Sequence, residues 1–320
     1  MKIESSISGC LPRPPGLISA TRKYDRSRIS DEELESSYRR HTEKVIKAQI
    51  ESGLTYINDG FLKRQDLLRP FTVKLNGVDV GQLYRWFDNN TFYRIPIIKG
   101  KISGNPPFND TYTDLLPEYK LKAVLPAPYT FVKLSKNQYY EDISILLTDF
   151  AEVLNKEIKS LEKKGYDYFQ LSDPALVYHK TVPNRELLQE IAGAFEVATQ
   201  DVDARTCLHT FFGDLSPIIN HVLDWSVDDL GFDCYETDVD SIKEYSFKGG
   251  LSLGLVDARN TLQENVDELV ALSNSFIEES SPERLIVSTN CDLDFLTWEK
   301  AQSKLLTVTN VAEQLTEEDQ

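Results

Sequence analysis

A repeated alternation of strand-like and helix-like segments constrains the fold of this chain more than any other feature. Short runs rich in β-forming residues recur along the sequence, each closed by glycine, proline, asparagine or aspartate, and most are followed by an amphipathic stretch. The eight runs are Ile7–Leu11, Leu54–Asp59, Lys122–Ala127, Tyr168–Ser172, Arg205–Phe212, Asp229–Tyr235, Leu251–Val256 and Arg284–Thr289. Eight strands with helical crossovers in 320 residues predict an α/β protein, a closed parallel (β/α)8 or TIM barrel that forms a single domain over residues 1–320.

An open, doubly wound parallel sheet is the alternative architecture for the same alternation. Its dinucleotide-binding form carries a G-x-G-x-x-G turn after the first strand, and no such turn follows the first run here. The sequence therefore favours the barrel.

Two segments carry the spacing of apolar residues that is typical of amphipathic helices. The first stripe consists of Ile143, Leu146, Leu147, Phe150, Leu154, Ile158 and Leu161. The second consists of Leu262, Val266, Leu269, Val270 and Phe276. In addition, Ser30 and Glu33 have the spacing of a capping box, which predicts a helix that begins just after Ser30.

One segment, residues 61–119, is too long for a simple connection and is expected to be an insertion after the second strand. Within it, Phe71–Leu75 and Val78–Val80 flank Asn76-Gly77, a pattern that predicts a β-hairpin with a type I′ turn. In a barrel such an insertion lies at the C-terminal face, where loops carry function. The alternative is a lid or dimer contact without chemistry.

Composition excludes several classes of function. The formal net charge is −16, so a surface that binds nucleic acid or anionic membranes, which needs clustered lysine and arginine, is not expected. No stretch approaches the roughly 20 consecutive apolar residues of a membrane span, and the N-terminus lacks a hydrophobic signal segment. The four cysteines show no close spacing, which argues against a disulfide framework and predicts a reducing, cytoplasmic location.

Polar residues follow most of the expected strands, and in a barrel these strand ends meet at one mouth. With the apolar Phe211 included, the residues at these strand ends are Asn58, Asp59, Ser172, Asp173, His209, Phe211, Asp214, Asp233, Cys234, Glu236, Asp257, Arg259, Asn260, Asn290, Cys291 and Asp292. His209 and Asp173 are the candidates for catalysis. The alternative for any single residue is that it caps a helix or forms a turn.

A metal site built from strand ends is a second possibility. His209, Cys234, Glu236 and Cys291 offer the nitrogen, sulfur and oxygen ligands that zinc takes, and they could converge at one barrel mouth. Against this, a buried cysteine in a strand is more often a small apolar residue.

Three segments, in order along the chain, resemble the cobalamin-independent methionine synthase family, and specifically its N-terminal, zinc-lacking barrel. Residues 85–93 read Arg-Trp-Phe-Asp-Asn-Asn-Thr-Phe-Tyr, where the family has Lys-Trp-Phe-Asp-Thr-Asn-Tyr-His-Tyr. Residues 210–213 resemble its Thr-Tyr-Phe-Gly, and residues 254–260 its Gly-Val-x-Asp-Gly-Arg-Asn. The resemblance covers about residues 8 to 300. It implies a TIM barrel and methyl-transfer chemistry.

The resemblance also implies that the family's zinc site is incomplete here. The catalytic barrel of the family ends a strand in His-Thr-His-x-Cys and uses the second His and the Cys as ligands, but the matching positions are Phe211 and Gly213, which have no donor atoms. The other two ligand positions match Glu236 and Cys291. We therefore expect no tightly bound cofactor and substoichiometric zinc. Ser172 replaces the leading carboxylate of the family's Asp-Glu-Pro-Ala, which argues against homocysteine binding in the family's manner.

In the family, basic residues of the N-terminal barrel hold the polyglutamate tail of methyl-tetrahydrofolate. By position these would be Arg22, Lys23 and Arg85, since a multiply charged anion needs fixed cations. The alternative is that all three are ordinary surface bases.

Together these features imply an accessory barrel in methionine biosynthesis. The methyl group would pass from methyl-tetrahydrofolate, or from a methyl-corrinoid, to homocysteine, and a separately encoded, zinc-bearing catalytic barrel would be the partner. One alternative is an independent TIM-barrel enzyme that uses His209, Glu236, Asp173 and Cys291 on another substrate. The other is a non-catalytic binding or regulatory partner.

Overall fold

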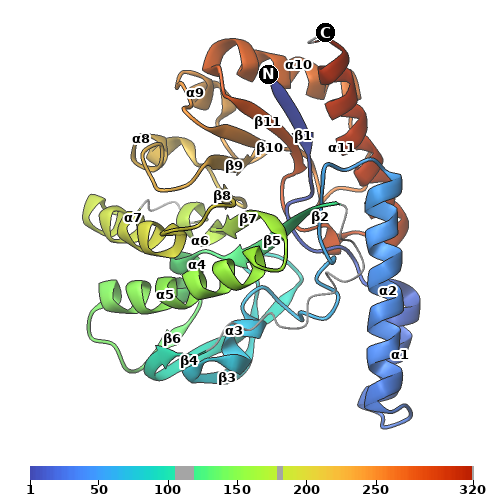
Figure 1. Cartoon of the computed structure of the whole chain (residues 1–320), viewed down its shortest axis with the longest axis vertical. Coiled ribbons are helices and arrows are strands. Elements are labelled where there is room, and N and C mark those ends of the chain that lie inside the picture. The colour runs from blue at the N-terminus through green and yellow to red at the C-terminus, as the bar shows by residue number, and fades with distance from the viewer. Residues whose placement is uncertain (105–118, 179–182, 319–320) are drawn as a thin grey trace.

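The computed structural model describes residues 1–104, 119–178 and 183–318, and within them a parallel eight-stranded sheet curves into a barrel (Figure 1). In spatial order the strands are β1 (Lys2–Ser5), β11 (Arg284–Thr289), β10 (Gly250–Val256), β9 (Asp229–Asp233), β8 (Arg205–Thr210), β7 (Tyr166–Ser172), β5 (Lys120–Pro126) and β2 (Tyr56–Ile57). All seven neighbouring pairs are parallel. The predicted barrel is confirmed.

Side-chain hydrogen bonds link β1 and the start of β2, the two ends of the sheet. The amide of Ser5 donates to Oγ1 of Thr55 at 3.0 Å, and the amide of Thr55 donates to Oγ of Ser5 at 3.0 Å. Farther along, the amide of Leu11 donates to the carbonyl of Gly60 at 3.1 Å. These contacts bring the loops after β1 and β2 together at one end of the barrel.

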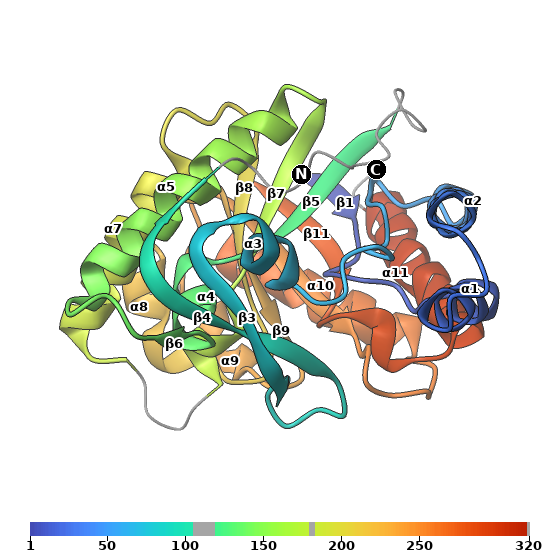
Figure 2. The ribbon, with the colours of Figure 1, turned by 90° about the horizontal axis from the view of Figure 1, so that it is seen from below.

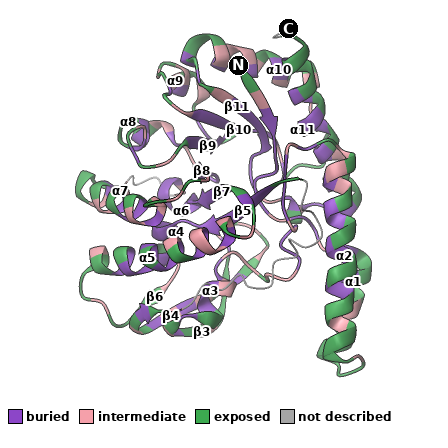
Figure 3. Cartoon of the chain, viewed as in Figure 1, coloured by how far each residue is buried: buried purple, intermediate pink, exposed green. Residues whose placement is uncertain are grey.

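Helices cover the outside of the barrel and bury one face each (Figure 3). The longer helices are α1 (Pro15–Asp25), α2 (Asp31–Glu51), α5 (Ile143–Glu162), α7 (Arg185–Thr199), α10 (Val266–Ser280) and α11 (Trp298–Glu318). The shorter ones are α3 (Arg69–Lys74), α4 (Pro128–Lys133), α6 (Pro174–Val177), α8 (Ile219–Val222), α9 (Val239–Lys243) and the 3-10 turns η2 (Ser216–Ile218) and η3 (Leu293–Phe295). The capping box of Ser30 and Glu33 is confirmed, as is the first apolar stripe, which forms the buried face of α5 except for Ile143, an exposed residue. In the second stripe, Leu262 lies before α10 and is exposed.

The position predicted for the first strand was wrong. Ile7–Leu11 forms the loop after β1, and the strand itself is Lys2–Ser5. The sequence did not indicate this strand because it contains a charged residue, Glu4, which is unusual in a buried strand. In the structure the carboxylate of Glu4 is buried in the barrel and forms ion pairs with Lys2, Lys120 and Arg205. The second strand, predicted as Leu54–Asp59, is confined to Tyr56–Ile57.

The insertion contains a hairpin, but not where the Asn-Gly turn placed it. Residues 69–74 form helix α3, and Asn76 and Gly77 open the long strand β3 (Asn76–Arg85), which pairs antiparallel with β4 (Phe92–Ser103). Strand β6 (Lys136–Asn137) adds to β4 in parallel. Residues 105–118 of the predicted insertion lie outside the described ranges. Figure 2 shows β3 and β4 crossing in front of the barrel strands.

Candidate functional site at the barrel mouth

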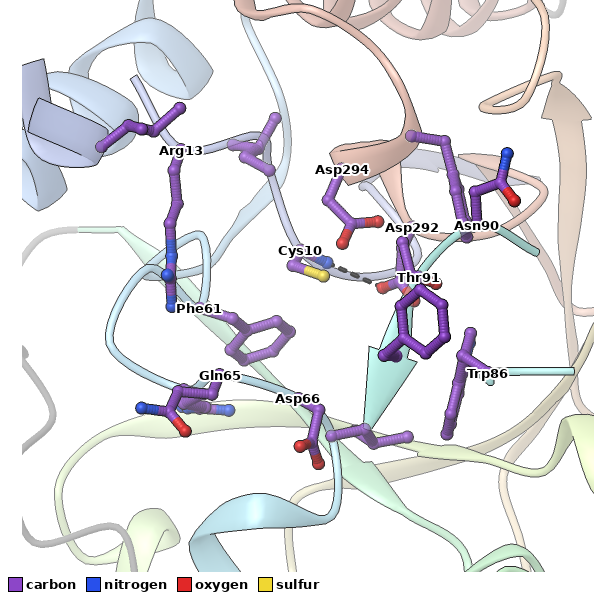
Figure 4. A pocket seen from close by; sticks show the side chains of 16 residues that line it. Cys10, Arg13, Phe61, Gln65, Asp66, Trp86, Asn90, Thr91, Asp292 and Asp294 are labelled. Carbon is purple, nitrogen blue, oxygen red and sulfur yellow. Dashed lines mark hydrogen bonds between the residues drawn. The ribbon is translucent and has the colours of Figure 1, made fainter. Parts of the chain in front are cut away.

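A pocket of about 510 Å³ opens among the loops that follow β1, β2 and β11, and the turn of the β3–β4 hairpin forms one of its walls (Figure 4). Its lining residues are Cys10, Leu11, Arg13, Ile18, Phe61, Arg64, Gln65, Asp66, Leu67, Trp86, Asn90, Thr91, Phe92, Asp292, Asp294 and Phe295. These loops lie at the C-terminal ends of the strands, where TIM barrels place their active sites.

One wall of the pocket carries a thiol and two carboxyl groups. One ligand-type atom each from Cys10, Asp292 and Asp294 lies within 4.8 Å of the others. The amide of Cys10 donates to Oδ1 of Asp292 at 2.9 Å, and the amide of Leu293 donates to the carbonyl of Cys10 at 2.9 Å, so the loops after β1 and β11 hold each other. Burial, together with the charge of Asp292, raises the pKa of Asp294 to about 7. This wall can accept hydrogen bonds from a ligand or contact a cation.

The opposite wall is aromatic and basic. The guanidinium of Arg64 lies 4.0 Å from the ring centroid of Phe61 and pairs with Asp59 at 3.3 Å, while Nε of Arg13 donates to the carbonyl of Leu62 at 3.1 Å. Across the pocket from Phe61, on the side of Asn90 and Thr91, Trp86 adds a second ring (Figure 4). A flat, polar molecule could stack on this wall while its donors face the carboxyl groups.

A basic groove of about 460 Å³ adjoins the pocket along α1. Its cations are Arg22, Lys23, Arg26 and Arg28, and Ile18 lines both cavities. Two of the three bases predicted to hold a folate tail, Arg22 and Lys23, therefore lie in one groove beside the pocket. Arg85 is at the end of β3, is exposed, and lines neither cavity.

The two catalytic candidates, His209 and Asp173, are fully buried and do not line the pocket. Nε2 of His209 lies 3.1 Å from the carbonyl oxygen of Asn290, and burial together with the charge of Lys122 lowers the pKa of this histidine to about 3. Burial raises the pKa of Asp173 to about 7, although Oγ1 of Thr130 donates to its Oδ1 at 2.6 Å. His209 is therefore neutral near pH 7, whereas Asp173 is close to the midpoint of its titration, and both side chains lie inside the wall of the barrel.

The alternative zinc set does not assemble. Across the described ranges, Cys10, Asp292 and Asp294 are the one group of three or more such side chains close enough to share an ion, so His209, Cys234, Glu236 and Cys291 do not gather. Strand β9 ends at Asp233, and Cys234 and Glu236 lie in the turn beyond it. Cys234 and Glu236 therefore do not lie on one face of a strand.

The residues present do not fit the family's four-ligand zinc site either. Phe211 is buried with an apolar ring at one ligand position. At the other, a Cβ atom on Gly213 would lie 2.1 Å from the carbonyl oxygen of Val177, so no side chain can stand there without a shift of the backbone. Of the two remaining positions, Glu236 already accepts a hydrogen bond from Nη2 of Arg259 at 2.6 Å.

Sequence reasoning named Asp292 among the strand ends but missed Cys10, Arg13 and Asp294. The error in the first strand accounts for Cys10, because it placed this residue inside a strand. The signal that marks a loop was present in Pro12-Arg13-Pro14-Pro15, since consecutive prolines cannot belong to a central strand.

A barrel with a polar pocket among its C-terminal loops has the architecture of the TIM-barrel enzymes. A family model described as "Cobalamin-independent synthase, Catalytic domain" matches residues 6–314. The chain therefore belongs to the cobalamin-independent methionine synthase family. The matching model is that of the catalytic domain, whereas the three motifs had indicated the N-terminal, zinc-lacking barrel.

A curated relative carries the name of this family, and two solved structures share the fold. The chain is 27% identical over 319 residues to a methionine synthase of Saccharolobus islandicus, with 96% of this chain and 92% of the relative covered. It resembles the B12-independent methionine synthase of Shewanella sp. W3-18-1, solved with selenomethionine, with a TM-score of 0.80, 19% identity and 99% of both chains covered. It also resembles the putative vitamin-B12 independent methionine synthase of Listeria monocytogenes, with a TM-score of 0.76, 18% identity and 98% coverage of both. In the described part of the chain, no helix is both long enough and apolar enough to cross a bilayer.

Proposed function

We propose that this chain is the accessory barrel of a split methionine synthase, in which a second chain supplies the zinc. The observation that carries this proposal is the closed ligand position at Gly213, where the carbonyl of Val177 leaves no room for a side chain. Zinc lowers the pKa of the homocysteine thiol and so produces the nucleophile. A barrel of this family without that site needs a partner for the reaction.

The two adjoining cavities support methyl-tetrahydrofolate as the methyl donor. The flat pterin ring would stack in the pocket with its donors toward Asp292 and Asp294, and the anionic tail would follow the groove of Arg22 and Lys23. Arg85 lies outside both cavities, so it would contact only a longer polyglutamate tail. A methylated corrinoid is the alternative donor.

Methyl transfer assays with and without a partner test this function. The isolated chain should not methylate homocysteine from methyl-tetrahydrofolate triglutamate, because it lacks the thiol-activating metal. Addition of a zinc-bearing catalytic barrel of the same family should give a rate above that of the partner alone. Turnover by the isolated chain at an enzyme-like rate, which is at least about 1 per second, would show the accessory role to be wrong.

The extent of the match to relatives favours a second candidate, an independent enzyme or binding protein, because this chain spans 92% of the length of a relative that is itself named a methionine synthase. Calorimetric titration of the isolated chain separates the two. The accessory role predicts that methyl-tetrahydrofolate triglutamate binds without turnover. Absence of binding, both alone and with the partner, would leave a different substrate as the better explanation.

A further inference from the structure

A thiol and two carboxyl groups on one wall of the pocket lie close enough together to hold a single ion (Figure 4). One ligand-type atom each from Cys10, Asp292 and Asp294 lies within 4.8 Å of the other two. One sulfur and two oxygens are donors that zinc and cobalt accept in proteins. Cys10 and Asp292 are half-buried and Asp294 is exposed, so an ion can reach all three from the pocket.

The two carboxyl groups of this wall lack a direct counter-charge. Within the described part of the chain, neither of them forms an ion pair with a lysine, arginine or histidine. The charge of Arg13 lowers the pKa of Asp294, but burial and the charge of Asp292 raise it by more, to about 7. Crowded acidic groups without a paired base favour the approach of a cation.

The backbone of two loops holds these donors in place. The amide of Cys10 donates to Oδ1 of Asp292 at 2.9 Å, and the amide of Leu293 donates to the carbonyl of Cys10 at 2.9 Å. A Cβ atom on Gly9 would lie 1.6 Å from Oδ1 of Asp292, so a glycine at this position is what lets the carboxylate lie against the loop after β1. Binding of an ion therefore needs little rearrangement of the chain.

A buried hydroxyl that lines the same pocket is a second, independent sign of a polar ligand. Oγ1 of Thr91 is shielded from solvent, and no hydrogen-bond partner for it lies among the described residues. A buried hydroxyl without a protein partner is satisfied by a water or by a ligand atom. An ion that carries water or a ligand into the pocket supplies that kind of partner.

We propose that Cys10, Asp292 and Asp294 form a site for one divalent transition-metal ion of the zinc or cobalt type. The side chains supply one sulfur and two oxygens, and the remaining coordination position faces the pocket, where it takes a water or a ligand with an oxygen or nitrogen donor. This site is separate from the four positions of the family's zinc, of which Glu236 and Cys291 keep a donor, and it does not restore them. The proposal concerns the chain by itself and holds whether or not the accessory function does.

Cobalt binding measured by visible absorption tests this proposal, because cobalt bound to a thiolate absorbs strongly. The wild type should show a saturable thiolate–cobalt band at one ion per chain, and zinc should displace the cobalt. Cys10→Ser should abolish the band. Asp294→Asn and Asp292→Asn should each weaken binding at least tenfold, and the new amide oxygen at position 292 can still accept the amide of Cys10. The matched control is Cys291→Ser, which removes a thiol outside the group and should leave the band unchanged.

Two outcomes would overturn the proposal. One is a wild type that shows no saturable band at up to millimolar cobalt. The other is a band that persists in Cys10→Ser or disappears in Cys291→Ser, since either result would put the ion elsewhere. Circular dichroism checks that each variant folds. Should Asp292→Asn not fold, Asp294→Asn carries the same expectation, because the side chain of Asp294 takes no part in the backbone hydrogen bonds between the loops. These titrations need no partner and no turnover, so their failure is distinct from failure of the proposed function.

Discussion

A single lysine inside the barrel makes stability depend on pH. Lys122 is fully buried, and its Nζ donates to Oγ of Ser6 at 3.0 Å and to the carbonyl of Ile7 at 2.8 Å. Burial lowers the pKa of Lys122 to about 7, against the raising effect of Cys207 and Asp229. The neutral amine still donates both hydrogen bonds, so it suits this interior better than the ammonium does.

Between pH 7 and the ordinary lysine pKa of 10.5, the unfolded chain holds a proton at Lys122 that the folded chain has lost. The free energy of unfolding should therefore rise with pH in this window, by up to about 1.4 kcal/mol per pH unit from this group. Below pH 7 both states are protonated and the contribution is constant.

Lys122→Met should remove that rise, since methionine does not titrate. Urea denaturation of both proteins at pH 6, 7, 8 and 9 measures the difference. Parallel pH profiles for the wild type and the variant would contradict the lowered pKa.

At the scale of an element, helix α1 decides which bases can act together. Arg22 and Lys23 share the groove along α1, whereas Arg85 lies at the end of β3, outside it. Arg22→Glu should weaken binding of methyl-tetrahydrofolate triglutamate by at least tenfold, and binding of the monoglutamate by less, because its tail carries fewer charges. The loss should shrink as salt is raised.

Titration calorimetry at two salt concentrations, with any partner present, measures these affinities. Arg85→Glu is the matched comparison, an equal change of charge outside the groove, and should have a smaller effect. Equal affinities for long and short tails in the wild type and both variants would remove the case for a tail site on this chain.

The elements also show what the sequence could and could not predict. Apolar spacing identified α5 because that helix buries one apolar face along its length. The hairpin was misplaced because an Asn-Gly pair satisfies several local structures, whereas tertiary contacts decide among them. Asp66 accepts the amides of Leu68 and Arg69, at 2.9 and 2.7 Å, and thereby starts helix α3 where a strand was expected. The actual turn connects Trp86 to Thr91, whose carbonyl accepts the amide of Trp86 at 2.9 Å.

For the whole molecule, the count and order of the strands followed from alternation alone. The arrangement of side chains at the barrel mouth did not. The position of Cys10 beside Asp294 depends on contacts between residues nearly 300 positions apart, which spacing cannot reveal. The burial of His209 could not be predicted from the sequence either, because a histidine at a strand end gives the same sequence pattern whether its side chain faces a pocket or is buried in the barrel wall.

Glu4 joins three strands at the other end of the barrel, and its replacement should lower the stability of the whole fold. It pairs with Lys2 at 2.6 Å, Lys120 at 3.1 Å and Arg205 at 3.0 Å. Burial alone would raise its pKa, but these cations more than offset that effect and hold the pKa of Glu4 below 4.5. Glu4→Gln should destabilise the protein by roughly 3 kcal/mol at pH 7, because the partners lose a buried counter-charge.

Since the folded pKa is lowered, this contribution is present above pH 4.5 and disappears as pH falls through the folded value. Denaturant midpoints of wild type and Glu4→Gln should therefore converge in acid. The control is Glu43→Gln, which removes an exposed pair with Arg39 at 3.7 Å and should change stability by less than about 0.5 kcal/mol. A neutral-pH difference no larger than that of the control would show that Glu4 does not tie the strands together.

The backbone that passes over Gly213 has a consequence for the history of such a chain. Substitutions that restored histidine at position 211 would still leave the second ligand without space, because the carbonyl of Val177 fills it. A return to the four-ligand zinc site thus requires the segment after β7 to be rerouted first, a change that point mutations do not make one at a time. The misfit to the four-ligand zinc site thus lies in the path of the main chain, and so it is far harder to reverse than the replacement of one side chain.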